Sequence, residues 1–447
     1  MTRGPGRAAA AIAGALVPAT LVLAVPGTSV PGATDLLPYV LGPVTGLFLL
    51  LVLIAAPLRR SGAATVPAFA RDRLASPAAV AAAAFCVAAV SALLTLPLLQ
   101  VAGVLLAQLT GAPTAAGVLA TGAALAVVCA LSSARTSVSG QAAALLVRAG
   151  ALVALLVLAA ATGQSAPATS AAQEVAARTA GAVAPQTGLA GFVAAASLFV
   201  ALACGTAGLP QVLGLVAGGP DGRGARAIAL RSIALSALVL AAGANAVTHL
   251  TASSVPGNAG VLLGRIGALA AAGAASFAAV RSAVSVGSTG RVARTRSRLI
   301  RAVIPLAATV IVLAAGATDL SWLLGWAFSL AAAALFPLMV LGSWHRGLTG
   351  TGVVAGMACA LVTTAAAALY TAVLSSGAAT SSGDFVAALA RQPALWTVPL
   401  SLAVTALASR ATRHHIPADV DTLMLRLHAP EALGLLSPGA HGGAKGL

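Results

Sequence analysis

The residues with the clearest capacity for chemistry lie inside a long apolar segment and combine helix-breaking backbone with polar side chains: Gly205, Thr206, Ala207, Gly208, Leu209, Pro210 and Gln211. Proline has no backbone N–H to donate, and glycine tolerates irregular backbone, so this run predicts a broken helix. At such a break the backbone groups and the partial charges of the two helix ends can bind ions. Thr206 and Gln211 add side-chain donors. The chemistry indicated is reversible binding of a small solute or ion.

A second set of helix breakers, Gly14 and Pro18, lies in the first apolar run. There the backbone of Gly14 and Ala15 and the hydroxyl of Thr20 are candidate solute ligands. If the first ten apolar runs form two five-helix halves, the first and sixth helices are equivalent, and an odd number of crossings inverts one half relative to the other. Paired broken helices predict a solute site at mid-membrane. Ordinary Gly and Pro in membrane helices is the alternative.

Arg281 lies deep in the apolar run 259–289, and it could serve as a fixed positive charge. The alternative is that its side chain reaches the inner surface, because Arg291 follows ten residues later. No Asp or Glu lies in the middle of an apolar run, which argues against a carboxylate proton relay. The cysteines and histidines show no metal-ligand spacing, and no catalytic constellation is visible. We therefore expect no enzyme, no bound metal and no cofactor.

The composition explains where these residues must lie. The chain of 447 residues is 59% hydrophobic and 8% charged, with a mean hydropathy of +1.00, whereas soluble domains carry roughly 25% charged residues. The solvent is therefore lipid, and the fold class is an all-α integral membrane protein. The apolar runs predict about twelve transmembrane helices: 8–25, 37–58, 78–109, 115–133, 139–162, 188–217, 225–250, 259–289, 297–317, 320–342, 352–374 and 393–411.

The net charge of +16 is distributed as a topology signal rather than as a nucleic-acid surface. Basic residues gather at the N-terminus, in every second loop and at the C-terminus, while the remaining loops hold only Arg178 and Arg391. This alternation places both termini in the cytoplasm and the chain in the plasma membrane as a multi-pass protein. The expected organisation is a first five-helix repeat at 1–162, a second inverted repeat at 188–342, two peripheral helices at 343–411 and a cytoplasmic tail at 412–447.

Several stretches, collinear over nearly the whole chain, resemble the sodium:solute symporter family, and in particular its cation/acetate symporter branch. The most specific is Gly205–Leu213, which resembles the motif Gly-Thr-Ala-Gly-Leu-Pro-His with Gln211 in place of the histidine. The other matching stretches are 35–43, 57–69, 220–223 and 347–356. The resemblance implies a LeuT-type fold, with two peripheral helices and without the family's extra N-terminal helix. It also implies import of a monocarboxylate such as acetate with a cation.

The resemblance further implies a cation site, which falls on Gly14, Ala15, Ala271, Ala272 and Ser276 in this chain. Hydroxyl residues that the family carries near these positions are largely replaced by alanine. A bare sodium ion requires several oxygen ligands, and backbone carbonyls would have to supply most of them.

Three hypotheses follow. The first is a monocarboxylate transporter coupled to sodium or protons. The second is a cation-independent carrier in which Arg281 replaces the ion. The third is a degenerate, non-transporting subunit that pairs with or regulates a full-length symporter. The partners expected are a small solute, the lipid bilayer and, under the third hypothesis, another membrane protein.

Overall fold

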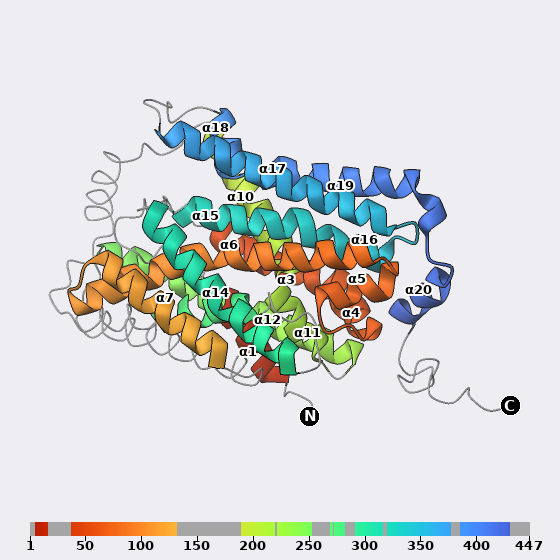
Figure 1. Ribbon diagram of the computed structural model, residues 1–447, viewed down its shortest axis with the longest axis horizontal. Coiled ribbons are helices and arrows are strands. Elements are labelled where there is room, and N and C mark those ends of the chain that lie inside the picture. Colours follow the sequence, from red (N-terminus) through yellow and green to blue (C-terminus); the bar gives the residue numbers. More distant parts are fainter. Residues whose placement is uncertain are drawn as a thin grey trace.

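The computed structural model describes residues 5–16, 37–131, 189–219, 221–252, 269–270, 272–281, 291–315, 320–376 and 385–429. Within these ranges every regular element is a helix, and most helices run roughly along the long axis of the molecule (Figure 1). This agrees with the expected all-α membrane architecture.

Seven of the described helical segments are long and apolar enough to cross a membrane. They are Pro38–Ser61, Pro77–Ala107, Thr114–Leu131, Leu189–Ala217, Trp322–Trp344, Gly350–Val373 and Ala394–Ala411. Each coincides with an apolar run of the sequence to within a few residues. The predicted run 139–162 lies outside the described residues, and the total of twelve spans, like the orientation, stays a prediction.

The first part of the chain contains three of these spans and a short connecting helix. Its elements are α1 (Pro5–Leu16), α3 (Leu37–Leu49), η2 (Leu50–Ile54), α4 (Ala55–Ser61), α5 (Val66–Leu74), α6 (Pro77–Thr110) and α7 (Thr114–Leu131). Thr65 and Ser76 cap α5 and α6 by accepting from backbone N–H groups three residues later, at 3.3 Å in each case. These caps stabilise the N-terminal ends of α5, the short helix between two spans, and of α6, the span that follows it.

The second part of the chain holds the predicted helix break. Its elements are α10 (Leu189–Gly208), α11 (Pro210–Ala217), α12 (Gly222–Ala252), α14 (Arg291–Ala315), α15 (Leu320–Leu330), η3 (Ala331–Leu335) and α16 (Phe336–Trp344). Helix α10 crosses α3 at close range, since a Cβ on Gly46 would lie 2.3 Å from the Ala203 carbonyl oxygen. Helix α1 packs against α11 and α12. The two predicted repeats are therefore in direct contact in the core.

The last elements form a pair of helices on one edge of the molecule and a short helix beyond them (Figure 1). They are α17 (Gly350–Ser376), α18 (Phe385–Arg391), α19 (Ala394–Ala411), η4 (Arg413–His415) and α20 (Val420–His428). Glycines on α17 let α19 approach closely, because a Cβ on Gly356 would overlap Thr405 Oγ1. The expected tail thus contains a folded helix, α20, which lies beside α4 and α16.

Helix α18 closes the end of the molecule opposite α20 (Figure 1). The hydroxyl of Ser197 on α10 donates to the Gln392 carbonyl oxygen and accepts from the Leu395 N–H, at 2.9 Å for the latter. The Trp326 indole on α15 donates to the Ala390 carbonyl oxygen at 3.2 Å. These bonds tie the α18–α19 turn to the core spans.

Two membrane helices contain a π-helical turn, η2 and η3, at which the α-helical hydrogen-bonding pattern is interrupted. The indole N–H of Trp344, at the end of α16, donates to the Leu53 carbonyl oxygen in η2 at 2.8 Å. The residues of η3 are all buried. Such turns leave backbone groups available to other partners and are frequent at functional sites.

Arg73 is a buried charge that joins α5 to α16. It is 1% exposed, and its guanidinium donates to the carbonyl oxygens of Gly342 (2.9 Å), His345 (2.8 Å) and Arg346 (3.2 Å). Carbonyls at a helix C-terminus have no partner within the helix, and their partial negative charge favours a cation. Burial lowers the pKa of Arg73 to about 10, with Asp419 opposing the shift, so the side chain stays charged at neutral pH.

We predict that Arg73→Met destabilises the protein, because the carbonyl oxygens of Gly342, His345 and Arg346 lose the guanidinium as a donor. The expected cost is about 2–4 kcal/mol, measured as a lower melting temperature of the detergent-solubilised protein. Arg71→Met is the matched control, since it removes the same charge from an exposed position on α5. Equal melting temperatures for the two variants would show that the bonds from Arg73 to the carbonyl oxygens at the end of α16 contribute nothing to stability.

Candidate functional site

The predicted break in the sixth apolar run is present. Helix α10 ends at Gly208, Leu209 is extended (φ −61°, ψ 123°), and α11 starts at Pro210. The Leu209 carbonyl accepts from the N–H groups of Val212 (3.1 Å) and Leu213 (3.0 Å), which restarts the helix. Because Pro210 has no N–H, the bond that would have continued α10 is lost at this residue. The carbonyl end of one half-helix therefore meets the N-terminal end of the next.

The backbone of α15 and η3 packs against the break. A Cβ on Gly205 would lie 2.6 Å from the Phe328 carbonyl oxygen, and one on Gly208 would lie 2.8 Å from that of Ala331, the first residue of η3. Only glycine permits such an approach of two backbones. The irregular segment of α10 is thus packed against the irregular segment of the α15–α16 span.

Two polar side chains at the break are buried without a hydrogen-bond partner among the described residues. Thr206 is fully buried and Gln211 is 8% exposed, and the unpartnered atoms are Thr206 Oγ1 and Gln211 Oε1. Ala207, between Gly205 and Gly208, is fully buried and offers only its backbone. A buried polar atom without a partner costs free energy. The sequence predicted Gln211 as a donor, whereas the atom in need of a partner is its acceptor oxygen.

The first helix lies beside α11, the half-helix that follows the break. Helix α1 contacts α11, and Gly14 and Ala15 lie in the last turn of α1. Thr20 lies outside the described residues. The structure therefore brings the helix of Gly14 and Ala15 to α11 and leaves the role of these residues a prediction.

Two of the predicted cation-site residues, Ala272 and Ser276, lie one turn apart on the helical segment 272–281. Ser276 is 1% exposed, and its hydroxyl donates to the Ala272 carbonyl oxygen at 2.8 Å. Ala271 lies outside the described residues. In this arrangement the Ser276 hydroxyl already has a bond within its own helix, and a cation would have to share both oxygens.

Arg281 belongs to a different neighbourhood. Its guanidinium carbon lies 6.0 Å from the ring centroid of Phe277. Phe277 packs in a separate cluster with Leu125 and Cys129 of α7. The contacts described for Arg281 therefore direct it towards α7 rather than towards Thr206 and Gln211.

One polar residue near the break was missed from the sequence. Ser329 follows Phe328 on α15, is fully buried, and its hydroxyl has no partner among the residues described. Its neighbour Phe328 is the residue whose carbonyl touches Gly205. A lone serine in an apolar run is too common to single out, and only the contact with α10 identifies it.

No protein-family model and no curated protein sequence matches the chain. Among solved structures, the chain is similar to a Na+-coupled sialic acid symporter in a substrate-bound, outward-open state, with a TM-score of 0.60 and 10% identity, covering 92% of this chain and 90% of that one. It also aligns with a manganese transporter of Eremococcus coleocola over 91% of this chain and 94% of that one, with 14% identity and a TM-score of 0.49. The second likeness is too weak to carry an argument.

The chain has the LeuT-type fold. The likeness to the symporter extends over nearly the whole chain, and the seven apolar helices make it a multi-pass membrane protein. The predicted fold is thereby confirmed. At 10% identity the comparison bears on the fold and leaves the acetate branch, the substrate and the coupling ion as predictions.

We predict that Gly205→Ala disturbs the break, because the added methyl would meet the Phe328 carbonyl oxygen at 2.6 Å. The expected destabilisation is about 1–3 kcal/mol. In Gly214→Ala the nearest atom would be the Ala64 carbonyl oxygen at 3.8 Å, so this control should be neutral or stabilised by the higher helix propensity of alanine. Thermal unfolding of both variants in the same detergent measures the difference, and an unchanged Gly205→Ala protein would contradict the packing argument.

Proposed function

We propose that the protein is a secondary transporter that carries a small monocarboxylate, such as acetate, together with a cation across the plasma membrane. The observation that supports this most is the buried break at Gly208–Pro210, together with the buried side-chain atoms Thr206 Oγ1 and Gln211 Oε1 on either side of it in the chain, which have no described hydrogen-bond partner. A broken helix is costly in a membrane unless the released groups have a ligand or a protein partner. The LeuT-type fold uses its broken helices for solute binding.

The chemistry of the break suits an anion and a cation bound together. The N-terminal end of α11 carries partial positive charge and attracts a carboxylate, to which the Thr206 hydroxyl can donate. The C-terminal end of α10 carries partial negative charge, and its carbonyls, with Gln211 Oε1, are oxygen ligands of the kind that hard cations take. In this proposal the polar atoms left without partners are used by the two cargo ions.

We further propose that residues 1–162 and 188–342 are the inverted repeats and that 343–411 are peripheral. The contacts of α1 with α11 and α12, and of α3 with α10, support this division because they join elements of the two proposed repeats. The Arg281 carrier has less support, since the described contacts of Arg281 lie with Phe277 and the α7 cluster. The non-transporting subunit remains the second candidate, because the cation-site serine already has a bond within its helix.

The first experiment is uptake of radiolabelled acetate into proteoliposomes that contain the purified chain, with and without an inward sodium gradient. Stimulation by sodium supports the proposed coupling. Uptake that responds to a proton gradient instead would assign the proton as the coupling ion. Absence of uptake of acetate, propionate and pyruvate, with protein orientation verified, would reject transport and favour the subunit.

We predict that Thr206→Val lowers acetate uptake roughly tenfold at sub-saturating acetate, because one hydrogen bond to the solute is lost in a buried site. The stability of this variant should be unchanged or higher, since Thr206 Oγ1 has no described protein partner. Thr363→Val is the matched control: its hydroxyl bonds to the Cys359 carbonyl oxygen within α17, on the peripheral helix pair. Equal uptake by both variants would exclude Thr206 from the solute site.

A further inference from the structure

The short helix α20, beyond the last span, is anchored to the core by its buried side chains. Met424 and Leu427 are 5% and 0% exposed, whereas Leu425 on the opposite face is 67% exposed. Helix α20 contacts α4 and α16, and it lies at the end of the molecule where those helices finish (Figure 1). A nine-residue helix is too short to be stable alone, so this docking maintains it.

Polar contacts attach α20 to α4. The Arg60 guanidinium donates to the carbonyl oxygens of Leu427 (3.3 Å) and His428 (3.1 Å). These are the last carbonyls of α20, which have no partner within the helix and carry partial negative charge. Arg60 therefore caps α20 from the end of the second apolar run.

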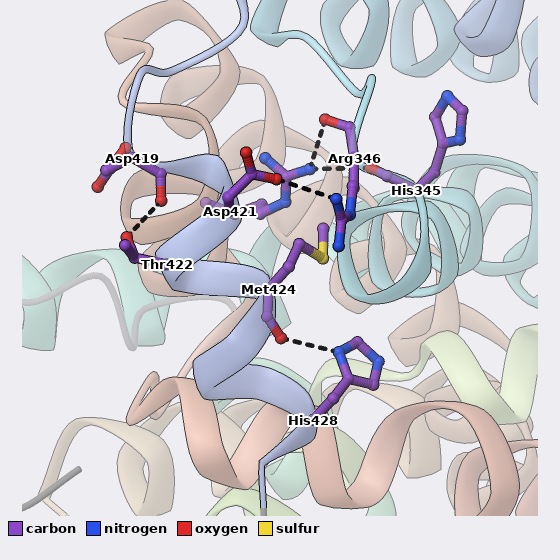
Figure 2. Close-up of polar contacts among 8 residues, drawn as sticks. His345, Arg346, Asp419, Asp421, Thr422, Met424 and His428 are labelled. Carbon is purple, nitrogen blue, oxygen red and sulfur yellow. Dashed lines mark hydrogen bonds and ion pairs between the residues drawn. The ribbon is translucent and has the colours of Figure 1, made fainter. Parts of the chain in front are cut away.

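A second set of contacts attaches α20 to α16. The ring of His428 meets that of Trp344 edge-on at 4.7 Å, and Arg346 pairs with Asp421 at 3.2 Å (Figure 2). The ion pair is exposed and contributes little by itself. The Trp344 indole also donates to the Leu53 carbonyl oxygen in η2, which joins the α15–α16 span to the α3–α4 span. Because His428 contacts Trp344, α20 lies next to this junction of the two spans.

We propose that α20 is a strap that holds the cytoplasmic ends of α4 and α16 together and so opposes opening of the inner side. This inference rests on the proposed transport function, in which one repeat moves relative to the other. Helix α4 belongs to the first proposed repeat and α16 to the second. If the two repeats move apart at this end, Arg60 on α4 moves away from Trp344 on α16. Helix α20 contacts both residues, Arg60 through its last carbonyl oxygens and Trp344 through His428.

The test is hydrogen–deuterium exchange of the full-length protein in detergent, followed by mass spectrometry. Leu427→Asp should detach α20 and raise exchange in α4 and α16 roughly tenfold or more at the slowest amides. Leu425→Asp is the matched control, because it adds the same charge to the same helix on its exposed face, and it should leave both peptides unchanged. Arg60→Gln removes the guanidinium cap and keeps the buried side chains of α20, so it should shift exchange in α4 and α16 in the same direction by a smaller factor.

The location of the change decides the outcome. Unchanged exchange in α4 and α16 of Leu427→Asp would overturn the proposal. An increase in exchange of equal size in residues 385–396 would also overturn it, because that pattern indicates destabilisation of the whole protein. An equal effect of Leu425→Asp on α4 and α16 would overturn it as well. The exchange measurement needs no solute, so a protein that fails to take up acetate can still show the strap, and failure of the strap leaves the uptake result unaffected.

Discussion

A backbone N–H or C=O that faces lipid without a hydrogen-bond partner costs several kcal/mol, which forbids irregular backbone in a membrane unless protein or ligand covers it. The segment around Gly208 and Pro210 departs from helical geometry under this constraint, and the surrounding fold is arranged to cover it. Gly205 and Gly208 admit the backbone of Phe328 and Ala331 to van der Waals range or closer. Thr206 Oγ1 and Gln211 Oε1 are buried near the break without a described hydrogen-bond partner, and the proposed function assigns these atoms to the cargo.

The same constraint connects the break to η3. The π turn η3 lies beside the break, because a Cβ on Gly208 would meet the Ala331 carbonyl oxygen at 2.8 Å. Helix α10 and the α15–α16 span therefore both depart from regular α-helix where they are in contact. The proposed function assigns the cargo ions to a position beside this contact.

The sequence predicted the elements whose signals are local. Pro210 and its glycines defined the break, and apolar length defined seven spans, because both depend on the chemistry of consecutive residues. It did not predict η2 or η3, since Leu50–Ile54 and Ala331–Leu335 contain nothing that distinguishes a π turn from an α turn. Arg281 was considered as a charge for the solute site, but the side of a helix that faces a given neighbour depends on tertiary packing, and Phe277 directs it towards α7.

The basic loops illustrate why position along the chain is an incomplete guide to role. In the sequence, Arg60 and Arg73 belong to one of the basic loops from which the orientation is predicted, and the positive-inside rule requires only their charge. In the structure each also donates to the terminal carbonyls of a helix from another part of the chain, Arg60 to α20 and Arg73 to α16. A cytoplasmic arginine near a helix end is attracted to such carbonyls by the helix dipole. If the predicted orientation holds, the arginines that set the topology also bind helix ends at the same membrane face, and this would account for the polar contacts among α4, α5, α16 and α20.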